Sequence, residues 1–134
     1  MNMIIAGHGH TNIRAEDSLS SAAANWLLDT SNCDLILTNP PFGTSESEAL
    51  EGEELAAYPV PSSKGQHLFL EKVVCATVSG GEIGTVIDEG VLNAAGAADL
   101  RRWLIQKCEL LAVVALSDDT FKPNKINVSQ ASCS

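Results

Sequence analysis

Three short and nearly uninterrupted apolar runs constrain the fold of this chain more than any other feature. They are DLILT at residues 34–38, EIGTVID at 82–88 and LLAVVAL at 110–116. Strands of a parallel sheet that are buried on both faces show continuous hydrophobicity, whereas strands with one solvated face alternate between apolar and polar residues. We therefore predict three strands here, and we expect residues 34–38 to be covered on both faces.

Helical patterns separate these runs. Leu70, Val74 and Val78 recur at four-residue spacing, which predicts a helix that starts near residues 62–63 and ends at the glycine pair 80–81. A second amphipathic helix is predicted over residues 97–108. The apolar face of this second helix comprises Leu100, Trp103, Leu104, Cys108 and Leu111.

The order of these segments predicts the fold class. Weaker strand signals at residues 12–17 and 126–132 flank the pattern. Strands that alternate with helices indicate an α/β fold with a mostly parallel sheet, and we expect right-handed crossovers to place helices on both faces. A chain of 134 residues is long enough for one such domain, so residues 1–134 are treated as a single unit.

A polar, acidic segment at residues 43–63 interrupts the pattern. It carries Glu46, Glu48, Glu51, Glu53 and Glu54. We predict a long loop here, because the segment has few apolar anchors before Tyr58. Long loops within compact domains are usually functional or mobile. A solvated acidic excursion without a role is an equally good interpretation.

Charge and cysteine content restrict the function classes. The net charge of −9 argues against a stand-alone nucleic-acid binder, which would show a basic face. The four cysteines form no C-x-x-C pair, so we interpret them as reduced thiols of a cytoplasmic protein. No apolar run is long enough to span a bilayer.

Polar residues follow the ends of several predicted strands. These positions are Asp17, Asn39 to Phe42, Asp88–Glu89 and Ser117 to Asp119. Ligands of open α/β sheets bind at the carboxyl ends of the strands, so this convergence favours a functional site over an ordinary turn. Within it, the sequence NPPF stands out, because two consecutive prolines fix two φ angles and stiffen the exit of the strand.

The NPPF segment suits chemistry on a planar amino group. The nitrogen of such a group becomes a better nucleophile when both N–H groups donate to fixed acceptors. The side-chain oxygen of Asn39 and the carbonyl of Pro40 could supply these acceptors. Phe42 offers a face for a flipped base to stack on, and Gly43 lets the chain turn away from the substrate.

NPPF resembles the catalytic motif of amino-methyltransferases that use S-adenosylmethionine. Such enzymes act on adenine in DNA, guanine in RNA or glutamine in proteins. The surroundings are more specific, and they resemble the modification subunit of type I restriction–modification systems over residues 1–127. The matching segments are NIRAEDSLS, DLILTNPPFG, SKGQHLFLEKVV, GGEIGTVIDEGVLN and DLRRWLIQKCELLAVVALSDDTFKP.

The resemblance implies an adenine-specific DNA methyltransferase with a Rossmann-like fold. Asn39, Pro40 and Phe42 would orient and stack the target adenine, while Pro41 would hold the loop. Asp17 would contact the adenine moiety of S-adenosylmethionine, and Asn39 would also lie beside the cofactor. The implied partners are DNA, reached through additional domains or subunits, and the specificity and restriction subunits of the system.

The glycine-rich cofactor loop of the family has no clear counterpart here. GHG at residues 7–9 precedes a predicted strand, and GGEIG at 80–84 follows a helix, so neither has the required strand–loop–helix context. We expect the chain to match the carboxyl-terminal part of a catalytic domain, to be inactive alone, and to self-associate through an open sheet edge. The alternative is a non-enzymatic remnant or an interaction module of the same fold.

Other candidate residues have ordinary interpretations. His8 and His10 lack a third ligand nearby, so no metal site is expected. His67 is predicted on a helix surface, and Trp103 in the core. Asp88 and its neighbour Glu89 could contact a ligand or cap a helix.

Overall fold

A computed structural model describes residues 18–19, 33–41, 55–56, 58–60, 62, 64–117, 120 and 128–133. Within them the element order is β1 (Cys33–Thr38), α4 (Gly65–Ala76), β2 (Thr77–Asp88), α5 (Glu89–Asn93), η2 (Ala95–Ala97), α6 (Ala98–Lys107), β3 (Leu110–Ala115) and β4 (Val128–Cys133). The three apolar runs all form strands, and the second predicted helix is α6. The predicted strand at 12–17 and most of the acidic segment at 43–63 lie outside the described residues.

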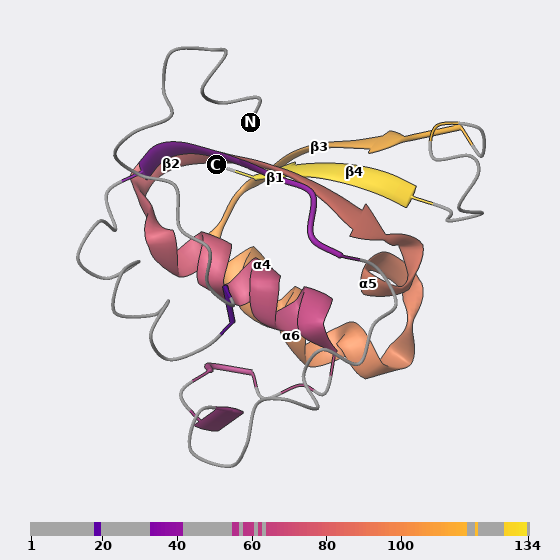
Figure 1. The fold of residues 1–134 in the computed structure, drawn as a ribbon, viewed down its shortest axis with the longest axis horizontal. Coiled ribbons are helices and arrows are strands. Elements are labelled where there is room, and N and C mark those ends of the chain that lie inside the picture. Colours follow the sequence, from indigo (N-terminus) through magenta and orange to yellow (C-terminus); the bar gives the residue numbers. More distant parts are fainter. Residues whose placement is uncertain are drawn as a thin grey trace.

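The described strands form one four-stranded sheet with the order β1-β2-β4-β3 (Figure 1). β1 pairs with β2 in parallel, and β4 runs antiparallel to both β2 and β3. β1, β2 and β3 therefore share one direction, and only β4 opposes them. The predicted α/β class with mostly parallel strands is confirmed.

The two long described helices, α4 and α6, lie on the same face of the sheet (Figure 1). The connections from β1 through α4 to β2, and from β2 through α6 to β3, move across the sheet in the same direction. Right-handed crossovers that move in one direction place their helices on one face. The expectation of helices on both faces is thus not met by the described helices, because it ignored the direction in which strands are added.

The main core lies between this face of β2 and the helices. Leu70, Ile87, Val91 and Leu100 form a buried cluster, and Trp103 packs against it. Fully burying one such aliphatic side chain contributes roughly 1.5–3 kcal/mol. The prediction that Trp103 is a core residue is confirmed.

β1 departs from its expected burial. Leu35 and Leu37 are 56% and 74% exposed, respectively, although the apolar run predicted cover on both faces. β1 pairs only with β2 in the described sheet and ends the strand order. The prediction was wrong because continuous hydrophobicity indicates that a strand needs cover and does not specify which element supplies it.

The boundary between α4 and β2 also differs from the prediction. α4 ends at Ala76, and β2 begins at Thr77 and runs through the glycine pair. The register with β1 shifts in this stretch, and Gly80 has a φ of 83°. A Cβ on Gly81 would lie only 3.0 Å from the carbonyl oxygen of Asp34. Gly80 supplies the positive φ and Gly81 the close approach to the β1 backbone, so the pair forms an irregularity inside a strand and does not end a helix.

A second, smaller cluster joins distant parts of the chain. Leu19, Tyr58 and Leu68 are buried together, and the hydroxyl of Tyr58 donates to the carbonyl of Leu19 at 3.0 Å.

None of the helices in the described part of the chain is long and apolar enough to cross a membrane.

Candidate functional site

The exit from β1 carries the first three residues of the NPPF segment. Asn39 and Pro41 are exposed, whereas Pro40 between them is fully buried. A residue that precedes a proline is restricted to extended backbone conformations, which stiffens the chain at Asn39 and Pro40. Pro40 therefore anchors the exit and leaves Asn39 accessible at the carboxyl edge of the sheet. Phe42 and Asp17 lie outside the described residues.

The end of β2 lies beside this exit. Thr38 at the end of β1 pairs with Thr85 in the parallel register, three residues before Asp88 at the end of β2. The Asp88 carboxylate accepts a hydrogen bond from the backbone N–H of Gly90 at 2.6 Å and caps α5. Of the two interpretations offered for Asp88, helix capping is the one that the contacts support.

Gln66, in the first turn of α4, connects the helix to this edge. Its side-chain oxygen Oε1 accepts a hydrogen bond from the backbone N–H of Asp88 at 3.2 Å. Its side-chain nitrogen Nε2 is buried and has no hydrogen-bond partner. Nothing in the sequence distinguishes Gln66, because a single glutamine at the start of a helix is ordinary.

His67 is buried, so its predicted place on the helix surface was wrong. Its Nδ1 lies 2.8 Å from the hydroxyl oxygen of Ser62, which also accepts the backbone N–H of Lys64 at 3.2 Å. Burial lowers the pKa of His67, and the nearby positive charges of Lys64 and Arg101 lower it further. His67 is thus favoured in its neutral form and helps to fix the start of α4.

Glu71 is a second buried polar residue that the sequence did not indicate. Its Oε2 accepts a hydrogen bond from the backbone N–H of Val60 at 2.9 Å, and its Oε1 has no partner. Burial raises the pKa of Glu71, although the bond from Val60 opposes this effect. Glu71 lies one helical turn after His67, and this four-residue spacing is the signal that could have placed both on one buried face.

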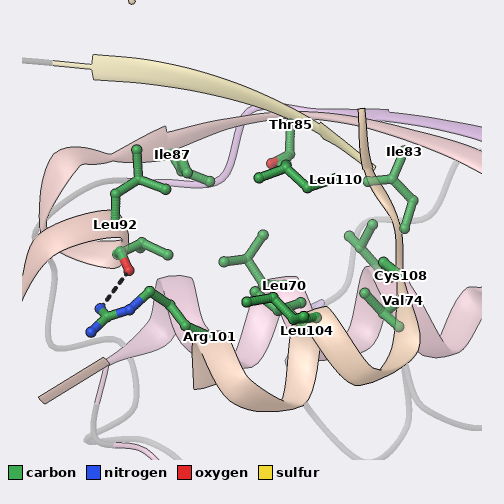
Figure 2. A pocket seen from close by; sticks show the side chains of 13 residues that line it. Leu70, Val74, Ile83, Thr85, Ile87, Leu92, Arg101, Leu104, Cys108 and Leu110 are labelled. Carbon is green, nitrogen blue, oxygen red and sulfur yellow. Dashed lines mark hydrogen bonds between the residues drawn. The ribbon is translucent and has the colours of Figure 1, made fainter. Parts of the chain in front are cut away.

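A largely apolar cavity of about 140 Å³ lies between the helices and the sheet (Figure 2). Leu70, Val74 and Leu104 line the helix side, and Ile83 and Ile87 line the sheet side. Arg101 lies at one end, where its guanidinium donates to the carbonyls of Val91 and Ala94 at 3.0 and 2.8 Å. Because Arg101 is already paired and most of the lining is aliphatic, this cavity offers no arrangement for polar chemistry.

Of the sequence-predicted positions, the exit at residues 39–41 and Asp88 lie at the carboxyl ends of two paired strands. Glu89 is exposed, and its carboxylate accepts from the side-chain amide of Asn93 at 3.1 Å. Ser117 follows β3 and lies 3.2 Å from the hydroxyl of Thr120. Asp118 and Asp119 lie outside the described residues. The candidate site is therefore the carboxyl edge formed by β1, β2 and the first turn of α4.

Comparison with known proteins now identifies the family. The protein-family model described as N-6 DNA Methylase matches residues 1–130. The chain is 27% identical over 124 residues to the type I restriction enzyme EcoEI methylase subunit of Escherichia coli, covering 91% of this chain and 24% of that protein.

Solved structures agree with this match. The crystal structure of the type I restriction enzyme EcoKI M protein aligns with a TM-score of 0.79 and 25% identity, covering 98% of this chain and 27% of that one. A candidate class I S-adenosylmethionine-dependent methyltransferase from Listeria monocytogenes shares the fold, with a TM-score of 0.61 and 15% identity over 75% of this chain and 31% of that one.

The chain spans about a quarter of the length of its type I relatives. The predicted Rossmann-like methyltransferase fold and the resemblance to type I modification subunits are both confirmed. Because the family model matches nearly the whole chain, the protein belongs to the N-6 DNA methylase family.

Proposed function

We propose that this chain contributes the acceptor side of a methyl transfer to the exocyclic amino group of adenine in DNA. The observation that carries the proposal is the exit of β1, where Pro40 is buried and Asn39 is exposed at the carboxyl edge of the sheet. Membership in the N-6 DNA methylase family supports the choice of reaction. In this proposal residues 1–134 belong to one partial catalytic domain, and residues 43–63 form an acidic loop beside it.

The proposed roles follow from the chemistry of each group. The side-chain oxygen of Asn39 and the carbonyl of Pro40 accept the two N–H groups of the adenine amine. Pro41 keeps the exit rigid, so both acceptors are positioned before the base arrives. Phe42 stacks on the flipped base and excludes water from one face of its ring.

S-adenosylmethionine is the methyl donor in this proposal. When bound, it would supply a methyl group from a positively charged sulfur, and the rest of the molecule would leave as a neutral thioether. The methylated amine would lose its proton to water. The exposed amide of Asn39 fits a role beside this donor, and Asp17 is proposed to contact the adenine moiety of the cofactor. We expect the 134-residue chain alone to bind the cofactor weakly and to show no turnover.

The test is transfer of a labelled methyl group from S-adenosylmethionine to adenine-containing DNA. The chain is assayed alone and as a hybrid in which it replaces the matching quarter of the EcoEI methylase subunit. We expect transfer by the hybrid and its loss on Asn39→Ala. Transfer by the hybrid that survives Asn39→Ala would contradict the assigned role, and label on guanine in RNA or on a protein glutamine would redirect the substrate.

Assembly with other chains is the second part of the proposal. Leu35 and Leu37 are exposed on β1, and such an apolar edge favours pairing with another strand. The proposed partners are the specificity and restriction subunits of a type I system, DNA held through further domains or subunits, and, for the isolated chain, a second copy of itself. Light scattering of the purified chain distinguishes self-association from a clean monomer.

A non-enzymatic interaction module of the same fold remains the competing function. The exposed apolar residues of β1 favour it as well, because they need a protein partner and not a substrate. This function predicts no methyl transfer by the hybrid, together with tight association between the chain and a partner subunit. The hybrid assay therefore separates the two functions.

A further inference from the structure

Gln66 holds a buried hydrogen-bond donor that nothing in the structure satisfies. The side chain is only 9% exposed, and its Nε2 has no partner. The identity of this atom follows from the other half of the amide, because only the oxygen can accept the N–H of Asp88. Buried donors of this kind are uncommon in native proteins and call for an explanation.

Glu71, another buried polar residue of α4, does not pair with the Gln66 amide. The Oε1 of Glu71 is also buried and without a partner. Glu71 lies five residues further along α4, a rise of about 7.5 Å along the helix axis, and no hydrogen bond joins the two side chains. The two unpaired groups therefore do not satisfy each other, and the Gln66 amide is free to donate to an incoming acceptor.

The position of the donor indicates where that group would be. Gln66 accepts a hydrogen bond from the backbone of Asp88 at the end of β2, and the end of β1 pairs with β2 up to Thr38 and Thr85. Neighbouring strands lie about 4.8 Å apart. The free amide of Gln66 and the exit that carries Asn39 and Pro40 therefore lie at the carboxyl ends of two neighbouring strands, on the same edge of the sheet.

We propose that Gln66 reads the acceptor base, with its Nε2 donating a hydrogen bond to a ring nitrogen next to the amino group. This inference rests on the proposed function. Adenine carries two acceptor nitrogens, N1 and N7, on either side of the carbon that bears its amino group. Asn39 and Pro40 accept hydrogen bonds from the amino group, while Gln66 donates one to the nearby ring nitrogen. The three residues together therefore recognise an amino group that has a hydrogen-bond acceptor beside it. A base with a donor at that ring position leaves the Gln66 amide unpaired and binds more weakly.

The test uses nuclear magnetic resonance of the 134-residue chain with adenosine as the probe. The side-chain amide signals of Gln66 are assigned by their absence in Gln66→Met, which keeps the length of the side chain and removes its polar atoms. We expect adenosine to shift these signals, and expect either 1-deazaadenosine or 7-deazaadenosine to fail to do so. Gln66→Met should weaken adenosine binding by about three- to tenfold, the value of one hydrogen bond.

Two controls separate the inference from the function on which it rests. Gln106 is exposed on α6, so its signals should stay fixed and Gln106→Met should leave adenosine binding unchanged. Adenosine binding that Asn39→Ala abolishes, but that leaves the Gln66 signals unmoved or tolerates both deaza analogues, overturns the inference alone. Absence of any Asn39-dependent adenosine binding overturns both the inference and the proposed acceptor site.

Discussion

Strands β2 and β3 are both rich in aliphatic side chains and run in the same direction, yet only β2 buries them. Ile87 of β2 is 2% exposed, whereas Leu111 of β3 is 54% exposed. β2 lies between β1 and β4 and is covered by α4, while β3 ends the strand order. Hydrophobicity thus predicts that both segments form strands, and their places in the sheet decide which one forms the core.

The largest expected effect contrasts the core next to β2 with the surface of β3. Leu100→Ala removes a fully buried side chain that packs with Ile87, and we expect a loss of about 2–5 kcal/mol of unfolding free energy. Val113→Ala on β3 should change it by no more than about 0.5 kcal/mol, because the side chain is already exposed. Urea denaturation of both variants measures the difference, and equal losses would mean that β3 is covered in solution.

The close approach of β2 to β1 provides the next contrast. In Gly81→Ala the new Cβ would lie 2.7 Å from the Thr77 methyl group and 3.0 Å from the Asp34 carbonyl, so we expect a loss of about 1–3 kcal/mol. Gly96→Ala is the matched control, because nothing lies within 4 Å of its added Cβ. Thermal unfolding of the two variants tests this, and an unchanged Gly81→Ala protein would argue against the irregular register near the start of β2.

A smaller, pH-dependent effect is expected at Glu71. Its pKa is raised in the folded state, so the folded protein holds a proton that the unfolded chain releases above its ordinary value of 4.5. Stability should therefore fall as the pH rises through 4.5 towards the folded pKa. Glu71→Gln removes this titration and should flatten the decline measured by denaturation from pH 4 to 8. A decline that is equally steep in the variant would assign it to other groups.

The smallest effect on stability is expected on the exposed side of the comparison. Val113→Lys should alter the unfolding free energy by about 0.5 kcal/mol or less, because its side chain already contacts solvent. It should nevertheless reduce self-association, since charge on an exposed strand opposes pairing between chains. Sedimentation at several concentrations measures this. Unchanged association would place the contact on β1, where Leu37→Lys is the corresponding variant.

Much of the fold was accessible from the sequence. The three apolar runs became β1, β2 and β3, and the amphipathic pattern at residues 97–108 became α6, because side-chain periodicity is a local property. The end of α4 was not accessible in this way. A glycine pair is a common helix stop, but here Gly80 adopts a positive φ and Gly81 allows β2 to pass close to the backbone of β1.

The candidate site was predicted only in part, because local patterns are visible in the sequence and long-range contacts are not. The segment at residues 39–41 was identified because its functional groups belong to consecutive residues, and Asn39 does lie exposed at the carboxyl edge. The polar residues buried on α4 were missed. Gln66 is fixed by a hydrogen bond to Asp88, 22 residues away, and Glu71 by one to Val60, 11 residues away.

Local sequence patterns specify most of the strand and helix segments, the α/β class and the NPPF motif. Contacts between distant segments set which aliphatic strand is covered, the face that both long described helices share, and the hydrogen bond that holds Gln66 at the end of β2 with its amide nitrogen unpaired. The physical reason is that propensity and periodicity act between near neighbours in the chain. Burial and hydrogen bonding at the site depend on strand order and register, which join residues that are distant in sequence.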